Sequence, residues 1–151
     1  MKKVSKRYAI LLCVTTAVAA CGGKDNVSPV DTESQAFDDL RDEVRLVVED
    51  PAREAQAILL VDALEHDFLA LSSVLKKRSS RTRELNADYD TTRAVFDAHL
   101  KSAQAELRKS RRNVTRTQLA LRDALSSAER EQIDKAHSKA MTATIKSMQA
   151  I

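Results

Sequence analysis

Residues 61–96 of this 151-residue chain read VDALEHDFLALSSVLKKRSSRTRELNADYDTTRAVF, and this stretch decides the fold. It lies within a longer segment, 51–125, that contains no glycine and, after Pro51, no proline. One set of positions, the seam, recurs in it at three- and four-residue steps, which is typical of one face of an α-helix. The seam consists of Val61, Leu64, Phe68, Leu71, Leu75, Arg78, Thr82, Leu85, Tyr89, Thr92 and Phe96, followed by Leu100, Ala103, Leu107, Ser110, Val114, Thr117, Leu121 and Ala124.

Two arrangements satisfy this seam. The first, which we favour because Leu85 and Tyr89 keep its phase, is one heptad-patterned helix about 110 Å long. The second is an antiparallel helical hairpin that bends at residues 76–83 or 86–88, where polar side chains dilute the seam. The centre of a continuous helix could not be covered by short flanking helices. The first arrangement therefore predicts an elongated homodimer through the central helix. Its contacts would be Leu75, Leu85, Tyr89 and Phe96.

A shorter helix is predicted before this segment, over residues 35–49, with Ser34 as its N-cap. It ends at Asp50-Pro51, because the residue before a proline leaves the α region and proline suits a first helical position. Its apolar stripe consists of Phe37, Leu40, Val44, Val47 and Val48.

Another short helix is predicted over residues 128–148. Ser126 and Glu129 have the spacing of a capping box at its start. Both short helices should fold back on the long segment to bury their apolar faces. The predicted fold class is therefore all-α, with residues 35–151 as one helical domain. The apolar face of the last helix consists of Ile133, Ala136, Ala140, Met141, Ile145 and Met148.

The start of the chain has the layout of a secretory signal peptide. Four basic residues precede an apolar run over residues 9–18, which is too short for a stable membrane span. The segment closes with Val18-Ala19-Ala20-Cys21. This ending resembles the signal of bacterial lipoproteins, in which small residues precede a cysteine that is lipidated and becomes the new N-terminus. The resemblance implies that residues 1–20 are removed and that Cys21 carries the lipid.

Further expectations follow from this resemblance. Residues 21–34 form a flexible tether, and the membrane is a partner through the lipid anchor. Gly22, in place of an aspartate after the lipidated cysteine, favours the outer membrane by the sorting rule of enteric bacteria. The expected location is therefore the outer membrane, with the protein facing the periplasm. The sequence does not name a protein partner.

Removal of residues 1–20 changes the charge of the chain. Four of the 25 lysines and arginines lie before Cys21 and no acid does, so 21 basic and 22 acidic residues remain. This balance, together with export, argues against nucleic acid as a partner. Cys21 is the only cysteine left, so no internal disulfide can form.

No pattern in the sequence indicates catalysis, and we expect neither an enzyme nor a cofactor. No serine, cysteine or lysine lies in a nucleophile motif, and no glycine-rich phosphate loop occurs. Asp134 and His137 share a helical turn as in di-metal bundles, but the second unit that such bundles require is lacking. We interpret these residues, with His66 and His99, as helix residues without a metal.

Two other groups of residues have candidate functions. Met141 and Met148 are interpreted as core residues rather than as a soft-metal site. The basic run over residues 108–112, continued by Arg116, is interpreted as a solvated face or as a partner of the acidic first helix. Contact of this run with anionic lipid or wall polymer is the alternative.

A second resemblance concerns residues 125–130. Leu125-Ser126-Ser127-Ala128-Glu129-Arg130 looks like the Leu-Thr-x-x-Gln motif of small helical periplasmic chaperones and metal-resistance sensors, with Ser for Thr and Glu for Gln. We therefore expect a lipid-anchored envelope protein that acts as a structural or protein-interaction module. A periplasmic chaperone or a metal or stress sensor is the alternative.

Overall fold

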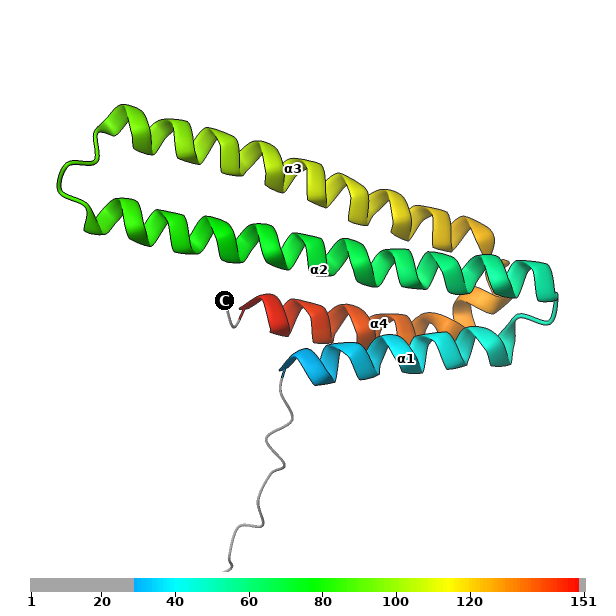
Figure 1. Ribbon diagram of the computed structural model, residues 1–151. Helices are drawn as coiled ribbons and strands as arrows, with labels where there is room; N and C mark the ends of the chain where they lie inside the picture. The colour runs from blue at the N-terminus through cyan, green and yellow to red at the C-terminus, as the bar shows by residue number, and fades with distance from the viewer. Residues whose placement is uncertain (1–28, 150–151) are drawn as a thin grey trace, which may run out of the picture.

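The computed structural model describes residues 29–149, which form four α-helices. α1 comprises Pro29–Val47, α2 Pro51–Ala87, α3 Arg93–Ala124 and α4 Ser127–Gln149. α2 and α3 form a long antiparallel hairpin. α1 and α4 form a second antiparallel pair, which packs beside the half of the hairpin that is remote from its turn (Figure 1), with α1 against α2 and α4 across from α3. The all-α prediction is confirmed.

The segment that we favoured as one continuous helix is a hairpin, so that preference was wrong. Its turn follows Ala87, at the second of the two predicted bends, while residues 76–83 remain helical. The Asp88 carboxylate accepts hydrogen bonds from the backbone N–H of Asp90 and the hydroxyl of Thr91, each at 3.0 Å. Thr92 caps α3 by accepting from the N–H of Val95. No described residue has a positive φ, so this turn needs no glycine.

The predicted seam is nevertheless the face along which α2 and α3 meet. Two contacts fix their register: Thr117 Oγ1 donates to Asp67 Oδ2 at 2.6 Å, and Thr82 Oγ1 lies 3.1 Å from His99 Nε2. Tyr89 is the main exception, because it lies fully exposed in the turn. The chain covers much of its own seam, which removes our reason for expecting a homodimer there. The oligomeric state itself stays a prediction.

α1 begins at Pro29, six residues before the predicted start at position 35. Residues 29–34, which we assigned to the tether, are therefore helical, and Ser34 is not an N-cap. Proline suits a first helical position because it has no N–H to leave unpaired. The added residues at the start of α1 lie beside α4. α1 runs antiparallel to α4, with Asp39 paired to Lys139, and the start of α1 lies beside the end of α4 (Figure 1).

The two other predicted helix boundaries are confirmed. Asp50 caps α2 by accepting from the N–H of Arg53 at 2.8 Å, with Pro51 as the first helical residue. Before α4, the N–H of Ser126 donates to the Glu129 carboxylate at 2.7 Å, and the N–H of Glu129 donates to Ser126 Oγ at 3.3 Å. These reciprocal bonds form the predicted capping box.

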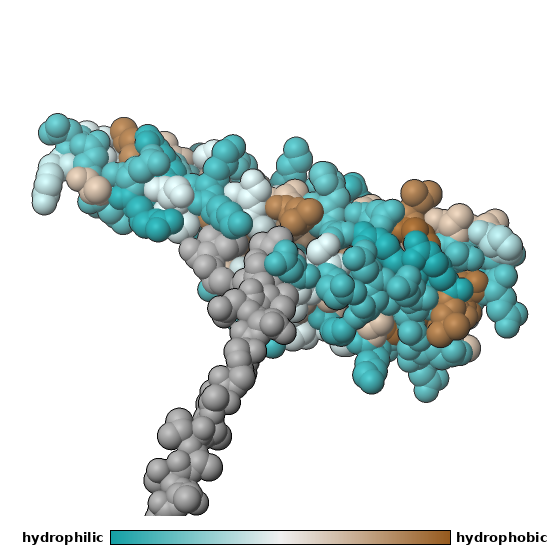
Figure 2. Space-filling model, turned by 60° about the horizontal axis from the view of Figure 1, so that its bottom comes forward, coloured by the Kyte–Doolittle hydropathy of each residue, from teal (hydrophilic) through white to brown (hydrophobic). Residues whose placement is uncertain are grey.

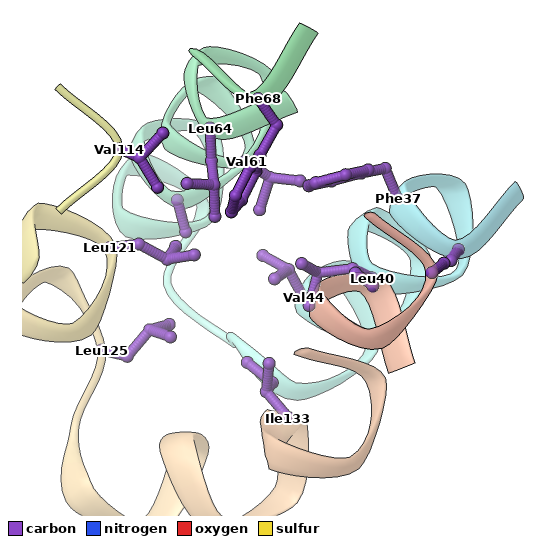
Figure 3. Packing of buried hydrophobic residues seen from close by; sticks show 14 of the residues in the cluster. Phe37, Leu40, Val44, Val61, Leu64, Phe68, Val114, Leu121, Leu125 and Ile133 are labelled. Atoms are coloured by element: carbon purple, nitrogen blue, oxygen red, sulfur yellow. The ribbon is translucent and has the colours of Figure 1, made fainter. Parts of the chain in front are cut away.

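The hydrophobic core lies where the four helices meet (Figure 3). Phe37 of α1 and Phe68 of α2 are buried there, with ring centroids 6.3 Å apart. Fully burying one such side chain contributes about 1.5–3 kcal/mol, so this cluster dominates stability. The labelled members are Phe37, Leu40, Val44, Val61, Leu64, Phe68, Val114, Leu121, Leu125 and Ile133.

Beyond this core the hairpin continues without α1 and α4, and we call residues 76–106 the arm (Figure 1). Among its described residues only Leu85 and Ala103 are buried apolar side chains. Its surface is largely hydrophilic on the face that Figure 2 shows. Nowhere in residues 29–149 does a helix have the length and apolar character needed to cross a membrane.

Candidate functional site

A groove of about 410 Å³ lies between α3 and α4. It exists because α3 packs mainly on α2 and α4 packs mainly on α1, so the two outer helices do not close tightly on each other. Leu121, Leu125 and Ile133 form its apolar base, and Figure 3 shows that these three side chains belong to the hydrophobic core. Leu119, 45% exposed, also lines it. The polar lining residues are Thr115, Gln118, Arg122, Arg130, Asp134 and His137.

The junction of α3 and α4 closes one end of this groove. Arg130 Nη1 donates to the carbonyl oxygen of Arg122 at 3.0 Å, which ties the first turn of α4 to the last turn of α3. Glu129 also pairs with Arg53 of α2. The hydrogen bond from the Ser126 N–H, with a further contribution from Arg53, lowers the pKa of Glu129 below its ordinary value. The carboxylate therefore remains charged, caps α4 and ties α4 to α2.

His137 is a half-buried member of the groove lining. Burial lowers the pKa of His137 below its ordinary value, against the opposite effect of Asp134 one turn earlier. The imidazole is therefore neutral at neutral pH. Among residues 29–149 there is no group of three His, Cys, Asp or Glu side chains that could hold a metal ion.

Farther along the α3–α4 interface, Gln118 Nε2 donates to Met141 Sδ at 3.2 Å. Met141 and Met148 pack against the hydrophobic core, which confirms their interpretation as core residues. The predicted face of α4 was wrong at Ile145, which is 53% exposed. Thr144 is buried instead, because its hydroxyl donates to the Ala140 carbonyl oxygen at 3.0 Å and is thus satisfied within the helix.

A second recess, of about 620 Å³, lies between the two helices of the arm. Lys77, Arg78 and Arg81 line it from α2, and His99 and Glu106 line it from α3. Arg81 pairs with Glu84 at 2.9 Å, and His99 is engaged by Thr82. This recess is polar and basic, in contrast to the groove.

The basic run of α3 is not paired with α1, so that part of our interpretation was wrong. Three acids of α1 bind elsewhere: Asp38 to Arg41, Asp42 to Arg45 and Asp39 to Lys139. Within residues 29–149 no ion pair involves any of residues 108–112. The side chains of Arg108, Lys109, Arg111 and Arg112 are exposed, as expected of a solvated face.

Arg41 is a structural residue that the sequence analysis missed. Its side chain is only 16% exposed and donates to Asp62 Oδ1 of α2 at 2.7 Å, as well as to Glu65. It thereby fixes α1 on α2. The available signal was the three-residue spacing of Asp62 and Glu65, which places both acids on one side of a helix.

Cys21 lies outside the described residues, and His66 is exposed on α2. No family model, curated protein or solved structure matches this chain. The exposed lining of the groove is mainly apolar, with polar groups at its margin. Its chemistry suits the binding of apolar side chains.

Proposed function

We propose that this protein is a lipid-anchored envelope protein whose helical bundle acts as a protein-interaction module. The observation that carries the proposal is Val18-Ala19-Ala20-Cys21, which ends a segment with the charge and length of a signal peptide. Cys21 would carry a thioether-linked diacylglycerol and an N-acyl chain. The outer membrane is the proposed location, with the bundle in the periplasm.

We assign partner binding to the groove between α3 and α4. Its proposed occupant is an amphipathic helix of another protein, because two helices form the walls and the surface between them is apolar. Such a helix would place a row of apolar side chains, at three- and four-residue steps, against Leu119, the exposed leucine of the lining. The guanidinium groups of Arg122 and Arg130 favour acidic residues beside that row.

Metabolic labelling of the full chain with an alkyne fatty acid tests the anchor. We expect label on the wild type, loss of label and of membrane association in Cys21→Ser, and retention of both in Cys13→Ser. Cys13 is the matched control because it lies in the segment that the proposal removes. Label that persists in Cys21→Ser would refute the anchor at this residue.

Site-specific photo-crosslinking in intact cells tests the groove. A photoreactive residue at position 119 should crosslink to one defined protein, and the same residue at position 59 should not. Leu59 is the control because it is exposed and apolar but lies on α2, outside the groove. The crosslink should disappear when Arg122→Glu and Arg130→Glu reverse the charge at the margin. Equal crosslinking from both positions would contradict the assignment.

The open apolar groove also suits a chaperone that binds unfolded segments of many proteins, which is our second candidate function. That activity predicts suppression of the aggregation of a heat-denatured model protein, and a sensor predicts metal binding by calorimetry. If the protein neither suppresses aggregation nor binds metal, and one defined partner is crosslinked, the interaction module is favoured. Suppression that Leu119→Glu abolishes would favour the chaperone.

A further inference from the structure

The outer face of α3 carries a row of basic side chains, which we call the basic stripe. Positions 101, 108, 112 and 116 share the side of α3 opposite the seam, and positions 109 and 111 flank them. All six side chains are exposed. They extend over about 22 Å of helix. The stripe consists of Lys101, Arg108, Lys109, Arg111, Arg112 and Arg116.

This positive charge is poorly compensated. Glu106 is the only acid between positions 101 and 116, and residues 76–83 of α2 add five basic residues and no acid. The pairing of Thr82 with His99 places those α2 residues beside this part of α3. Within residues 29–149, the polar contacts of these basic residues are few: Arg81 with Glu84, Arg83 with the Ser79 carbonyl, and Arg116 with Asn113. Like charges at this density favour an anionic partner.

We propose that the basic stripe binds the anionic headgroups of the membrane that holds the lipid on Cys21. This inference rests on the proposed anchor for the proximity of a bilayer. A covalent lipid keeps the stripe within reach of the headgroups. Weak contacts, each of which raises the affinity about fivefold, can then act together. The long axis of the hairpin would then lie along the membrane surface.

The length of chain before α1 permits this orientation. From Cys21 to Pro29 the extended chain spans at most about 28 Å. The outer surface of α3 lies at most about 25 Å from the axis of α1, because α2 contacts both helices and the sum of two helix spacings of 8–10 Å and one helix radius is an upper bound. The lipid can therefore enter the same surface that the basic stripe contacts.

A second copy of the chain is a poorer partner for the basic stripe. Its acidic counterpart would be the outer face of α1, where Asp38 and Asp42 already pair with Arg41 and Arg45. An anionic bilayer offers negative charge along the whole 22 Å of the stripe, whereas three of the carboxylates of α1 are already paired within the chain.

Vesicle binding by the chain from residue 21 onward, carrying Cys21→Ser, tests the proposal. This protein retains every described residue and cannot be acylated at Cys21, so the result does not depend on the anchor. We expect binding to phosphatidylcholine vesicles that contain about 30% phosphatidylglycerol, and none to phosphatidylcholine alone. Raising salt from about 0.05 M to about 0.5 M should abolish this binding.

Two triple variants with equal loss of charge locate the contact. Arg108→Gln, Arg112→Gln and Arg116→Gln together should weaken binding on the order of a hundredfold. Arg93→Gln, Lys135→Gln and Lys146→Gln together should weaken it less than about fivefold, the effect of a single contact. All six residues are exposed on helices, and circular dichroism checks that both variants fold.

Equal weakening by the two triples would overturn the proposal, because binding would then follow net charge alone. It would also be overturned if salt-sensitive self-association without vesicles depended on the stripe, which would assign this surface to a second copy. Tighter binding to an anionic wall polymer than to the vesicles would also overturn the proposal, because the polymer would then be the better partner. If Cys21 is not labelled but the stripe binds vesicles, the proposed lipidation of Cys21 is wrong and membrane binding by the basic stripe is still supported.

Discussion

Asp50 and Pro51 together make the passage from α1 to α2. Asp50 supplies the side-chain cap, and Pro51 supplies a preset φ without losing a needed donor. Asp50→Ala should therefore lower the free energy of unfolding by about 1 kcal/mol. Pro51→Ala should lower it by less than about 1 kcal/mol. Urea unfolding followed by circular dichroism measures both, and a loss above about 3 kcal/mol for Pro51→Ala would mean that the connection is misinterpreted.

His137 should make stability depend on pH. Burial lowers its pKa in the folded protein, while the unfolded chain keeps the ordinary value of 6.5. As pH falls below about 6.5, the unfolded chain binds the proton first, so stability decreases until the folded pKa is passed. The contribution of His137 is therefore complete above the ordinary pKa and fully lost only once the pH is below the folded pKa. His137→Gln should flatten the decline between about pH 7 and pH 5 in urea titrations.

The matched control for this measurement is His66→Gln, because His66 is exposed on α2. It removes an exposed imidazole from the same bundle and so controls for the loss of a histidine as such. An unchanged slope in His137→Gln would contradict the effect of burial. Glu129 affects stability in a separate pH range. Because its pKa is lowered in the folded protein, its contribution to stability is lost only as pH falls below the ordinary glutamate value of 4.5.

Local chemistry explains which residues could be predicted from the sequence. Asp50 and Ser126 act on backbone groups three residues away, so their spacing alone identifies them. The burial of His137 could not be predicted, because it depends on how α4 lies against α3. The role of Arg41 likewise depends on acids more than 20 residues later in the chain.

At the scale of elements, the seam was predictable but its path was not. The same apolar positions face a partner whether the helix continues or reverses, so hydrophobic periodicity does not distinguish the two. Reversal is decided by the Asp88 carboxylate and the Thr92 cap, which together satisfy the backbone through the turn. These residues also occur inside helices, and no glycine or proline marks the turn.

The arm should be less stable than the four-helix part, because it buries few apolar side chains. Leu85 is the one buried apolar residue that α2 contributes to it, at 5% exposure. Leu85→Lys should therefore accelerate amide hydrogen exchange throughout residues 76–106 and leave exchange near Phe68 almost unchanged. Leu59→Lys, at an exposed position of the same helix, is the control. Uniform acceleration across the whole chain would show that the arm and the core unfold as one unit.

At the scale of the whole molecule, the hairpin changes the prediction for self-association. Leu85 is buried by the chain's own α3, and Tyr89 points into solvent at the turn. We therefore expect the form carrying Cys21→Ser to be an elongated monomer in analytical ultracentrifugation at micromolar concentration. Its frictional ratio should exceed that of a compact sphere because the arm projects beyond α1 and α4 (Figure 1). A dimer at this concentration would contradict the expectation and require another surface.

The placement of α1 and α4 was only partly predictable. Their amphipathic stripes required them to fold back, as predicted. Their pairing with each other on one side of α2 rests on contacts between distant residues, such as Asp39 with Lys139 and Arg53 with Glu129. The groove follows from that choice, so neither its existence nor its lining could be predicted from periodicity.

The exposed turn at Tyr89 has a consequence for how the chain could be divided. A protease that cleaves after aromatic residues would find this bond accessible, and the cut would separate α1 and α2 from α3 and α4. Each fragment would keep part of the core, with Phe37 and Phe68 on one and Leu121 and Ile133 on the other. Because the core already unites these halves, two separately produced polypeptides should assemble into the same bundle, and the turn is a natural position for inserting a reporter domain.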